Sequence, residues 1–356
     1  MLTRNPFIIF CLLFFVAAAP SIALADTSAT ILIYHRFGDD RYPTTNVSTE
    51  AFVDQMNFLR DNNYTVLPLA ELVSMVKQDR EIPARSVVIT IDDAYASVYE
   101  NAWPILKEHG YPFTVFVYTG GVERNYGDYM NWDQLRELKE QGVDLQDHGF
   151  SHNHLAFKPA DMGEVGYRAM ISGDLAKSMA LFSRELGDTP RFFAIPYGEY
   201  NDIVIDEAKN MGFEAIFSQD PGSVGLYSDP YSLPRQPILG REWASLPHFE
   251  KILKIADLPV TDLTPHPQQL TSPLVSRYQV RILQPDAYVP GSFGFWISGL
   301  GWHQAQQDGD ILFFETDKPL QRPINRIVVS GRRAKDGKLA TRTWMLIHPD
   351  GDKAGQ

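Results

Sequence analysis

Cysteine is nearly absent from this sequence of 356 residues, which contains a single one, Cys11. Because Cys11 lies in an N-terminal apolar run, removal of that run would leave neither a disulfide nor a thiol nucleophile. Clusters of basic side chains are also lacking, and the formal net charge is −12. Contacts with phosphates depend on clustered Lys and Arg, so the composition excludes a nucleic-acid partner.

Long hydrophobic runs are lacking too, apart from residues 7–19. This run is shorter than the roughly 20 apolar residues of a membrane-spanning helix. Arg4 precedes it and the small-residue pattern Ala23-Leu24-Ala25 follows it, which is typical of a secretory signal peptide over residues 1–25. We therefore expect export to the periplasm or the extracellular space, with no membrane span after cleavage. An uncleaved anchor is the alternative.

Between residues 31 and 239, short apolar runs alternate with helical patterns. One such pattern places Phe52, Met56 and Leu59 on a single helical face. Alternation of this kind predicts parallel strands joined by crossover helices, and hence an α/β fold. Seven or eight units could close into a barrel, and an open doubly wound sheet is the alternative.

The composition and the hydrophobic pattern of the sequence change after about residue 257. Residues 257–275 are rich in proline and polar side chains, and we interpret them as a linker. Beyond them, short alternating segments at 277–283, 292–300, 310–316, 325–331 and 341–349 predict strands. The expected organisation is a signal peptide (1–25), an α/β domain (26–256), a linker (257–275) and a small all-β domain (276–356).

Two adjacent carboxylates, Asp92 and Asp93, follow the buried-strand pattern of residues 86–91. Neighbouring negative charges raise each other's pKa unless a cation compensates them. An Asp-rich turn is the simpler interpretation, since Asp is common in turns. The functional interpretation is that one carboxylate binds a cation while the other performs proton chemistry.

His148 and His152 lie four residues apart, directly after a strand pattern at residues 143–146. Parallel strands end at one rim of an α/β fold, so these imidazoles can meet the aspartates there. Two His and one carboxylate make a three-ligand site for a divalent ion with a position left for water or substrate. Surface or packing histidines are the common alternative for such a pair taken alone.

Three further residues follow strand patterns and belong to the same rim. Tyr197, in a Pro-Tyr-Gly turn, offers a backbone N–H suited to an oxyanion, although a plain turn explains the motif equally well. Arg235 could hold a carboxylate in its ionised form, or be exposed. His35 ends the first predicted strand, where a structural, hydrogen-bonded histidine is the usual finding.

Taken in order, the motifs TIDDAY (90–95), HGFSH (148–152), FFAIPYG (192–198) and LPR (233–235) resemble those of the NodB-type polysaccharide deacetylases, carbohydrate esterase family 4. The early LIYHRF (32–37) resembles the poly-N-acetylglucosamine deacetylase branch. In that branch the motif with the acid histidine comes first, a circular permutation of the common order. The resemblance covers about residues 30–240.

The resemblance implies a distorted (β/α)7–8 barrel that hydrolyses N-acetyl groups of a glycan with a divalent metal. Zn²⁺ is the ion we predict, with Co²⁺, Ni²⁺ and Fe²⁺ as alternatives. The implied partner is a polysaccharide or oligosaccharide substrate.

Carried over position by position, the motifs assign a role to each candidate residue. They imply a catalytic base at Asp92, metal ligands at Asp93, His148 and His152, an oxyanion position at Tyr197, an orienting arginine at Arg235 and a general acid at His35. His248 and His266 are the alternatives for the acid if the motif order is not permuted.

The chain departs from the family pattern at three places. Ala94 stands where glycine usually follows the aspartate pair, and Gly149 stands where Ser or Thr usually follows the first metal histidine. Arg191 lies five residues before Pro196, whereas the family commonly has its arginine close to that proline.

Two other functions remain open from the sequence. An O-acetyl esterase could use the same site, since the two reactions differ mainly in the leaving group. A glycan-binding protein with an impaired site could act through the β-rich domain, where Trp296, Trp302 and Trp344 could stack on sugar rings. We expect most of these tryptophans to be core residues instead.

Overall fold

A mostly parallel β-sheet organises the N-terminal two thirds of the described chain. The computed structural model describes residues 28–351, so the expected signal peptide and Cys11 lie outside the described residues. The main path of the sheet runs in the order β10 (Val224–Gly225), β1 (Ser28–Tyr34), β5 (Ser86–Asp93), β6 (Thr114–Val117), β7 (Asp144–Asp147), β8 (Phe192–Ala194) and β9 (Ala215–Phe217). All neighbours from β1 to β9 are parallel, which confirms the α/β class.

Short strands extend this sheet at several points. β4 (Thr65–Val66) pairs with β5 and β11 (Gln236–Pro237) with β1, both in parallel, while β2 (Arg36–Phe37) and β3 (Asn46–Val47) form a separate parallel pair. Leu233 donates its N–H to the carbonyl of Ile216 in β9, and β11 begins three residues later. The segment from Leu233 to β11 therefore contacts both outer strands of the parallel set.

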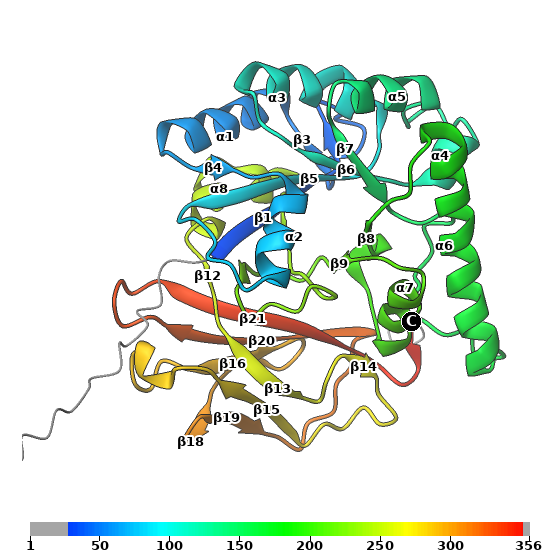
Figure 1. The fold of residues 1–356 in the computed structure, drawn as a ribbon. Coiled ribbons are helices and arrows are strands. Elements are labelled where there is room, and N and C mark those ends of the chain that lie inside the picture. Colours follow the sequence, from blue (N-terminus) through cyan, green and yellow to red (C-terminus); the bar gives the residue numbers. More distant parts are fainter. Residues whose placement is uncertain (1–27, 352–356) are drawn as a thin grey trace, which may run out of the picture.

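Within residues 28–351, eight α-helices connect and cover these strands (Figure 1). They are α1 (Thr49–Asp61), α2 (Leu69–Lys77), α3 (Trp103–His109), α4 (Thr119–Glu123), α5 (Trp132–Glu140), α6 (Glu164–Leu186), α7 (Asp202–Asn210) and α8 (Leu246–Ile252). A π-helical turn (Val98–Ala102) leads into α3, and short 3₁₀ turns occur at Pro196–Gly198, Arg241–Ala244 and Pro285–Ala287. The predicted apolar face of α1 is confirmed, since Phe52, Met56 and Leu59 are all fully buried.

Local sequence explains where several helices begin and end. The Ser48 hydroxyl accepts a hydrogen bond from the N–H of Ala51 and caps α1. Asn131 and Gln134 form a capping box at the start of α5. Gly110 ends α3 in the left-handed conformation, with φ of 66°, as expected for a glycine after the last helical turn.

The C-terminal part of the chain consists of two stacked β-sheets (Figure 1). One sheet contains β12 (Ala256–Asp257), β21 (Leu339–Ile347), β20 (Ile324–Arg332), β16 (Gly294–Ile297) and β17 (Gly301–Gln304) in this order, with β14 (Gln268–Gln269) beside β21. The other contains β13 (Val260–Thr264), β15 (Arg277–Ile282), β19 (Ile311–Glu315) and β18 (Gln306–Asp308). A shared apolar cluster that includes Tyr278 from one sheet and Trp344 from the other lies between them.

The segment expected to be a linker, residues 257–275, has a different local structure. It contributes β13 and β14, which pair with β15 and β21. The side chains of β13 are mostly exposed, so this edge strand shows no hydrophobic period and is held by its backbone hydrogen bonds. A sequence pattern that depends on side-chain burial could not predict such a strand.

The C-terminal sheets pack directly on the α/β part. Met345 and Ile347 of β21 belong to the same apolar cluster as Tyr200. Arg326 of β20 donates to the buried carboxylate of Asp220 at 3.0 Å. The side chains at this contact are therefore both apolar and charged.

Candidate active site at the ends of β5, β7 and β8

The two aspartates lie where β5 ends, and the chain leaves the strand in an unusual conformation. Every residue of β5 is buried, including Asp92 and Asp93. Asp93 has φ of 74° and Ala94 has φ of 64°, both in the left-handed region that favours glycine. The usual glycine after the aspartate pair fits this conformation, and here the fully buried Ala94 adopts it.

Asp92 forms a bidentate ion pair with Arg235. The two carboxylate oxygens accept from Nη1 and Nη2 at 2.7 and 2.8 Å, and both side chains are 0% exposed. Burial alone raises the pKa of Asp92, but the Arg235 guanidinium together with the imidazoles of His148 and His35 outweighs it, so the net pKa lies below the usual value. The pair therefore holds Asp92 as a carboxylate.

Other contacts fix Arg235 in this orientation. Its Nε donates to the carbonyl of Ser218 at 3.0 Å, and Nη1 also donates to the hydroxyl of Thr90 at 3.1 Å. The backbone N–H of Arg235 donates to the carbonyl of Asp220, whose side chain pairs with Arg326. The C-terminal sheets thus contact the segment that holds Arg235.

Asp93, His148 and His152 converge on one point. Nε2 of His152 lies 2.9 Å and Nε2 of His148 lies 3.4 Å from Oδ1 of Asp93. Burial raises the pKa of Asp93, but the contacts with the two imidazoles outweigh it and hold the pKa well below its usual value. One ligand atom from each of the three residues lies within 4.8 Å of the other two.

The three side chains fit a divalent ion on several grounds. Ligand atoms at zinc bond lengths in a tetrahedral site are about 3.4 Å apart, close to the two distances from Oδ1 of Asp93 to the imidazole nitrogens. Nδ1 of His148 lies 2.7 Å from the carbonyl of Ala194, which fixes a proton on that nitrogen and leaves Nε2, on the side of Asp93, as the nitrogen available to an ion. Oδ1 of Asp93 is buried and has no aligned hydrogen-bond donor among the described residues.

Two acidic residues that sequence reasoning missed brace the loop between the histidines. Asp174 of α6 accepts from the N–H groups of Phe150 and Ser151 at 3.0 and 2.9 Å. Asp147 accepts from the N–H of Gly149 at 2.7 Å, and burial raises the pKa of Asp147 to about 7. These two side chains support the loop at the place where the family usually has a Ser or Thr hydroxyl and this chain has Gly149.

Tyr197 lies at the same rim, in the turn after β8. Its φ is 60°, and its ring packs 4.8 Å from that of His152 and stacks on His154 at 3.8 Å. Gly198 is required in this turn, because a Cβ there would lie 2.2 Å from the backbone nitrogen of Gln219. The turn thus holds the ring of Tyr197 beside a candidate metal ligand.

His35 follows β1 directly and is buried. Its Nδ1 has no hydrogen-bond partner among the described residues. Burial lowers the pKa of His35, while the nearby carboxylates of Asp93 and Asp92 oppose that shift. The alternative acids lie elsewhere: His248 packs against Trp243, and His266 is exposed. The structure thus places His35, of these three, in the field of both aspartates.

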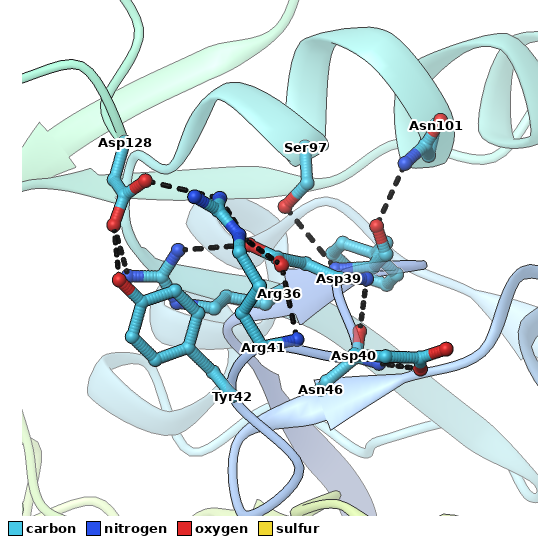
Figure 2. Close-up of polar contacts among 10 residues, drawn as sticks. Arg36, Asp39, Asp40, Arg41, Tyr42, Asn46, Ser97, Asn101 and Asp128 are labelled. Carbon is cyan, nitrogen blue, oxygen red and sulfur yellow. Dashed lines mark hydrogen bonds and ion pairs between the residues drawn. The ribbon is translucent and has the colours of Figure 1, made fainter.

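The residues after His35 form a dense polar cluster (Figure 2). Arg36 lies between the rings of Tyr42 and Tyr95, at 3.7 and 3.4 Å from their centroids. It also pairs with Asp39 and Asp128. These contacts anchor the chain on the C-terminal side of His35.

Comparisons with known proteins agree with this geometry. A family model described as "Polysaccharide deacetylase" matches residues 79–216. A poly-β-1,6-N-acetyl-D-glucosamine N-deacetylase of Staphylococcus aureus is 30% identical over 194 residues, covering 53% of this chain and 67% of the relative. The chain belongs to the polysaccharide deacetylase family.

Solved structures related to this deacetylase share its fold. IcaB from Ammonifex degensii is 26% identical, with a TM-score of 0.56 over 64% of this chain and 97% of that chain. The Streptococcus pyogenes deacetylase PplD, in complex with acetate, is 23% identical, with a TM-score of 0.56 over 64% of this chain and 98% of that chain. The family membership confirms the predicted resemblance and the prediction of a carbohydrate-deacetylating hydrolase.

The range matched by the family model covers only part of the candidate site. It includes five of the candidate residues: Asp92, Asp93, His148, His152 and Tyr197. His35 precedes the range, while Arg235 and the C-terminal sheets follow it. Within residues 28–351, none of the helices combines the length and hydrophobicity needed to cross a membrane.

Proposed function

We propose that this protein is an exported, divalent-metal-dependent deacetylase that removes N-acetyl groups from a glycan containing N-acetylglucosamine. The convergence of Asp93, His148 and His152 beside the Asp92–Arg235 pair is the observation that carries this proposal. The Staphylococcus aureus relative, named for its action on poly-β-1,6-N-acetyl-D-glucosamine, supports the choice of substrate. The N-terminal pattern of residues 1–25 supports export.

The metal site consists of Asp93, His148 and His152 in this proposal, with Zn²⁺ as the ion and Co²⁺, Ni²⁺ or Fe²⁺ as alternatives. When bound, such an ion supplies Lewis-acid polarisation of the acetyl carbonyl and lowers the pKa of a coordinated water. The carbonyl of Ala194 holds His148 in the tautomer that this role requires.

The remaining residues have separate roles in proton transfer and in stabilising the oxyanion. Asp92, held ionised by Arg235, accepts a proton from the attacking water. The N–H of Tyr197 is the proposed donor to the developing oxyanion. His35 donates a proton to the departing amine; a lowered pKa makes His35 a stronger acid, although it reduces the protonated fraction at neutral pH.

The proposed domain organisation follows the same evidence. We infer a distorted barrel for the α/β domain (26–256), supported by the segment that contacts both β9 and β1. For the proposed β-rich domain (276–356), the strands of the described residues 276–351 support this assignment, and strands from 257–275 also contribute.

The substrate itself can extend beyond the metal site. A cavity of about 900 Å³ adjoins His154, which stacks on Tyr197. Glu199 from the α/β part and Gln269 from the C-terminal part both line it. A volume of this size is typical of a ligand-binding pocket and leaves room for sugar units that flank the reacting one.

Acetate release tests this function. Metal-loaded protein is expected to release acetate from poly-β-1,6-N-acetylglucosamine oligomers, to lose this activity with a chelator, and to regain it with Zn²⁺ or Co²⁺. O-acetylated xylan serves as the comparison substrate. Faster release from xylan would favour an O-acetyl esterase, and release unaffected by chelation would contradict the metal site.

A further inference from the structure

Two tryptophans occupy neighbouring positions on one face of the six-stranded C-terminal sheet. Trp296 of β16 and Trp302 of β17 are direct cross-strand partners in the antiparallel register. They are 40% and 55% exposed, whereas Trp344 of the same sheet is 1% exposed and lies in the core. Cross-strand partners project from the same side of a sheet, so the two indoles form one surface.

The indole of Trp302 lies flat against the backbone of β16. A Cβ at Gly294 would lie 2.6 Å from Nε1, Cε2 and Cζ2 of this ring. Glycine is therefore required opposite Trp302, and its absent side chain leaves room for the ring to lie against the strand. One face of the indole is covered by backbone, and the other face is directed to solvent.

Two uncharged side chains adjoin this pair, and the charged Arg326 on the same face is paired with Asp220. Val328 of β20 is paired with Trp296, and Gln304 of β17 is paired with Gly294. Both therefore lie on the same side of the sheet as the indoles. Exposed aromatic patches of this kind usually mark binding sites. A flat aromatic surface suits the apolar face of a pyranose ring.

Another part of the same sheet face packs against the α/β part of the protein. Arg326 of β20 and Thr343 of β21 project from this face and bind Asp220 and the carbonyl of Pro221. The α/β part covers the β20–β21 side, and the tryptophans of β16 and β17 lie beyond it. The two tryptophans are thus held on a sheet that is packed against the catalytic part.

We propose that Trp296 and Trp302 form a stacking platform for the sugar rings of the polysaccharide substrate. The platform is a second glycan-binding surface, built by the C-terminal sheets and separate from the candidate metal site. It keeps a long glycan attached to the protein and raises the local concentration of its acetylated units. The choice of glycan rests on the proposed function.

The test compares Trp302→Ala, Trp296→Ala and the double variant with Trp243→Ala, a matched control. Trp243 is also exposed, at 47%, but it lies in the Arg241–Ala244 turn and packs on His248. Binding of long poly-β-1,6-N-acetylglucosamine is measured by intrinsic fluorescence in the presence of a chelator, so that no turnover is required. Thermal unfolding checks that each variant is folded.

We expect Trp302→Ala to weaken binding of the long glycan about tenfold, as for other aromatic binding residues, and Trp302→Phe to retain most of it. In turnover, KM for the long glycan should rise while kcat/KM for a disaccharide is unchanged. Unchanged binding in the folded double variant would overturn the platform. Because binding is measured without catalysis, failure of the deacetylase proposal would appear separately, as absent acetate release.

Discussion

Replacing Arg235 with methionine should destabilise the protein strongly, because it leaves Asp92 as an uncompensated buried charge. Both side chains are 0% exposed and are joined by two hydrogen bonds of 2.7 and 2.8 Å. Removing one partner of a buried ion pair costs about 3–5 kcal/mol. The carbonyl of Ser218 and the hydroxyl of Thr90 also lose a donor, at about 1 kcal/mol each.

Urea unfolding at pH 7 measures this effect. The matched control is Arg191→Met, because Arg191 pairs with Glu214 at 2.6 Å on the surface. Its side chain is 55% exposed, so we expect the control to lose less than about 1 kcal/mol.

The double variant Asp92→Asn/Arg235→Met tests the physical cause. It removes the buried charge together with its partner, so it should be more stable than Arg235→Met alone by about 2 kcal/mol or more. A loss below about 1 kcal/mol in Arg235→Met would refute the reasoning. So would a double variant no more stable than the single one.

Three further predictions concern the rest of the molecule. Burial raises the pKa of Asp257 to about 6, above its unfolded value, so stability should fall as pH rises from about 4 to 7. Asp257→Asn should raise the free energy of unfolding by about 3 kcal/mol at pH 8 and change it little at pH 4, as measured by denaturant unfolding. An equal effect at both pH values would contradict this prediction. Arg326→Met should lower stability by about 2 kcal/mol because it strips the cation from buried Asp220, with Arg326→Lys intermediate in unfolding experiments. Asp174→Ala should weaken zinc affinity about 10- to 100-fold in a competition titration, because it releases the loop between the histidines; unchanged affinity would contradict this role.

The sequence was most informative where side-chain chemistry and strand order coincide. Asp92 and Asp93 end a continuous apolar strand, and His148 follows another strand of the same parallel sheet. Because parallel strands end at one rim, their meeting could be predicted without coordinates. The partner of Asp92 is 143 residues further along the chain. The sequence pattern left Arg235 either paired with a carboxylate or exposed, and the family resemblance favoured the pair.

Other features depend on contacts that leave no periodic pattern. In the sequence, Asp174 resembles a solvent-exposed helix residue, but in the structure its carboxylate braces the loop between the two histidines. β13 is held by backbone hydrogen bonds, and its polar side chains resemble a linker. Core burial was expected for most of the three C-terminal tryptophans, yet only Trp344 of these is buried, because alternation alone does not say which sheet face is covered.

The central claim is that Asp93, His148 and His152 hold the ion on which deacetylation depends. The most direct test measures bound metal per chain and acetate release on the same preparations of wild-type protein, Asp93→Asn and Asp92→Asn. We expect one ion per chain in the wild type and in Asp92→Asn, with acetate released only by the wild type, and loss of both metal and activity in Asp93→Asn. Full metal occupancy and wild-type acetate release in Asp93→Asn would contradict the account.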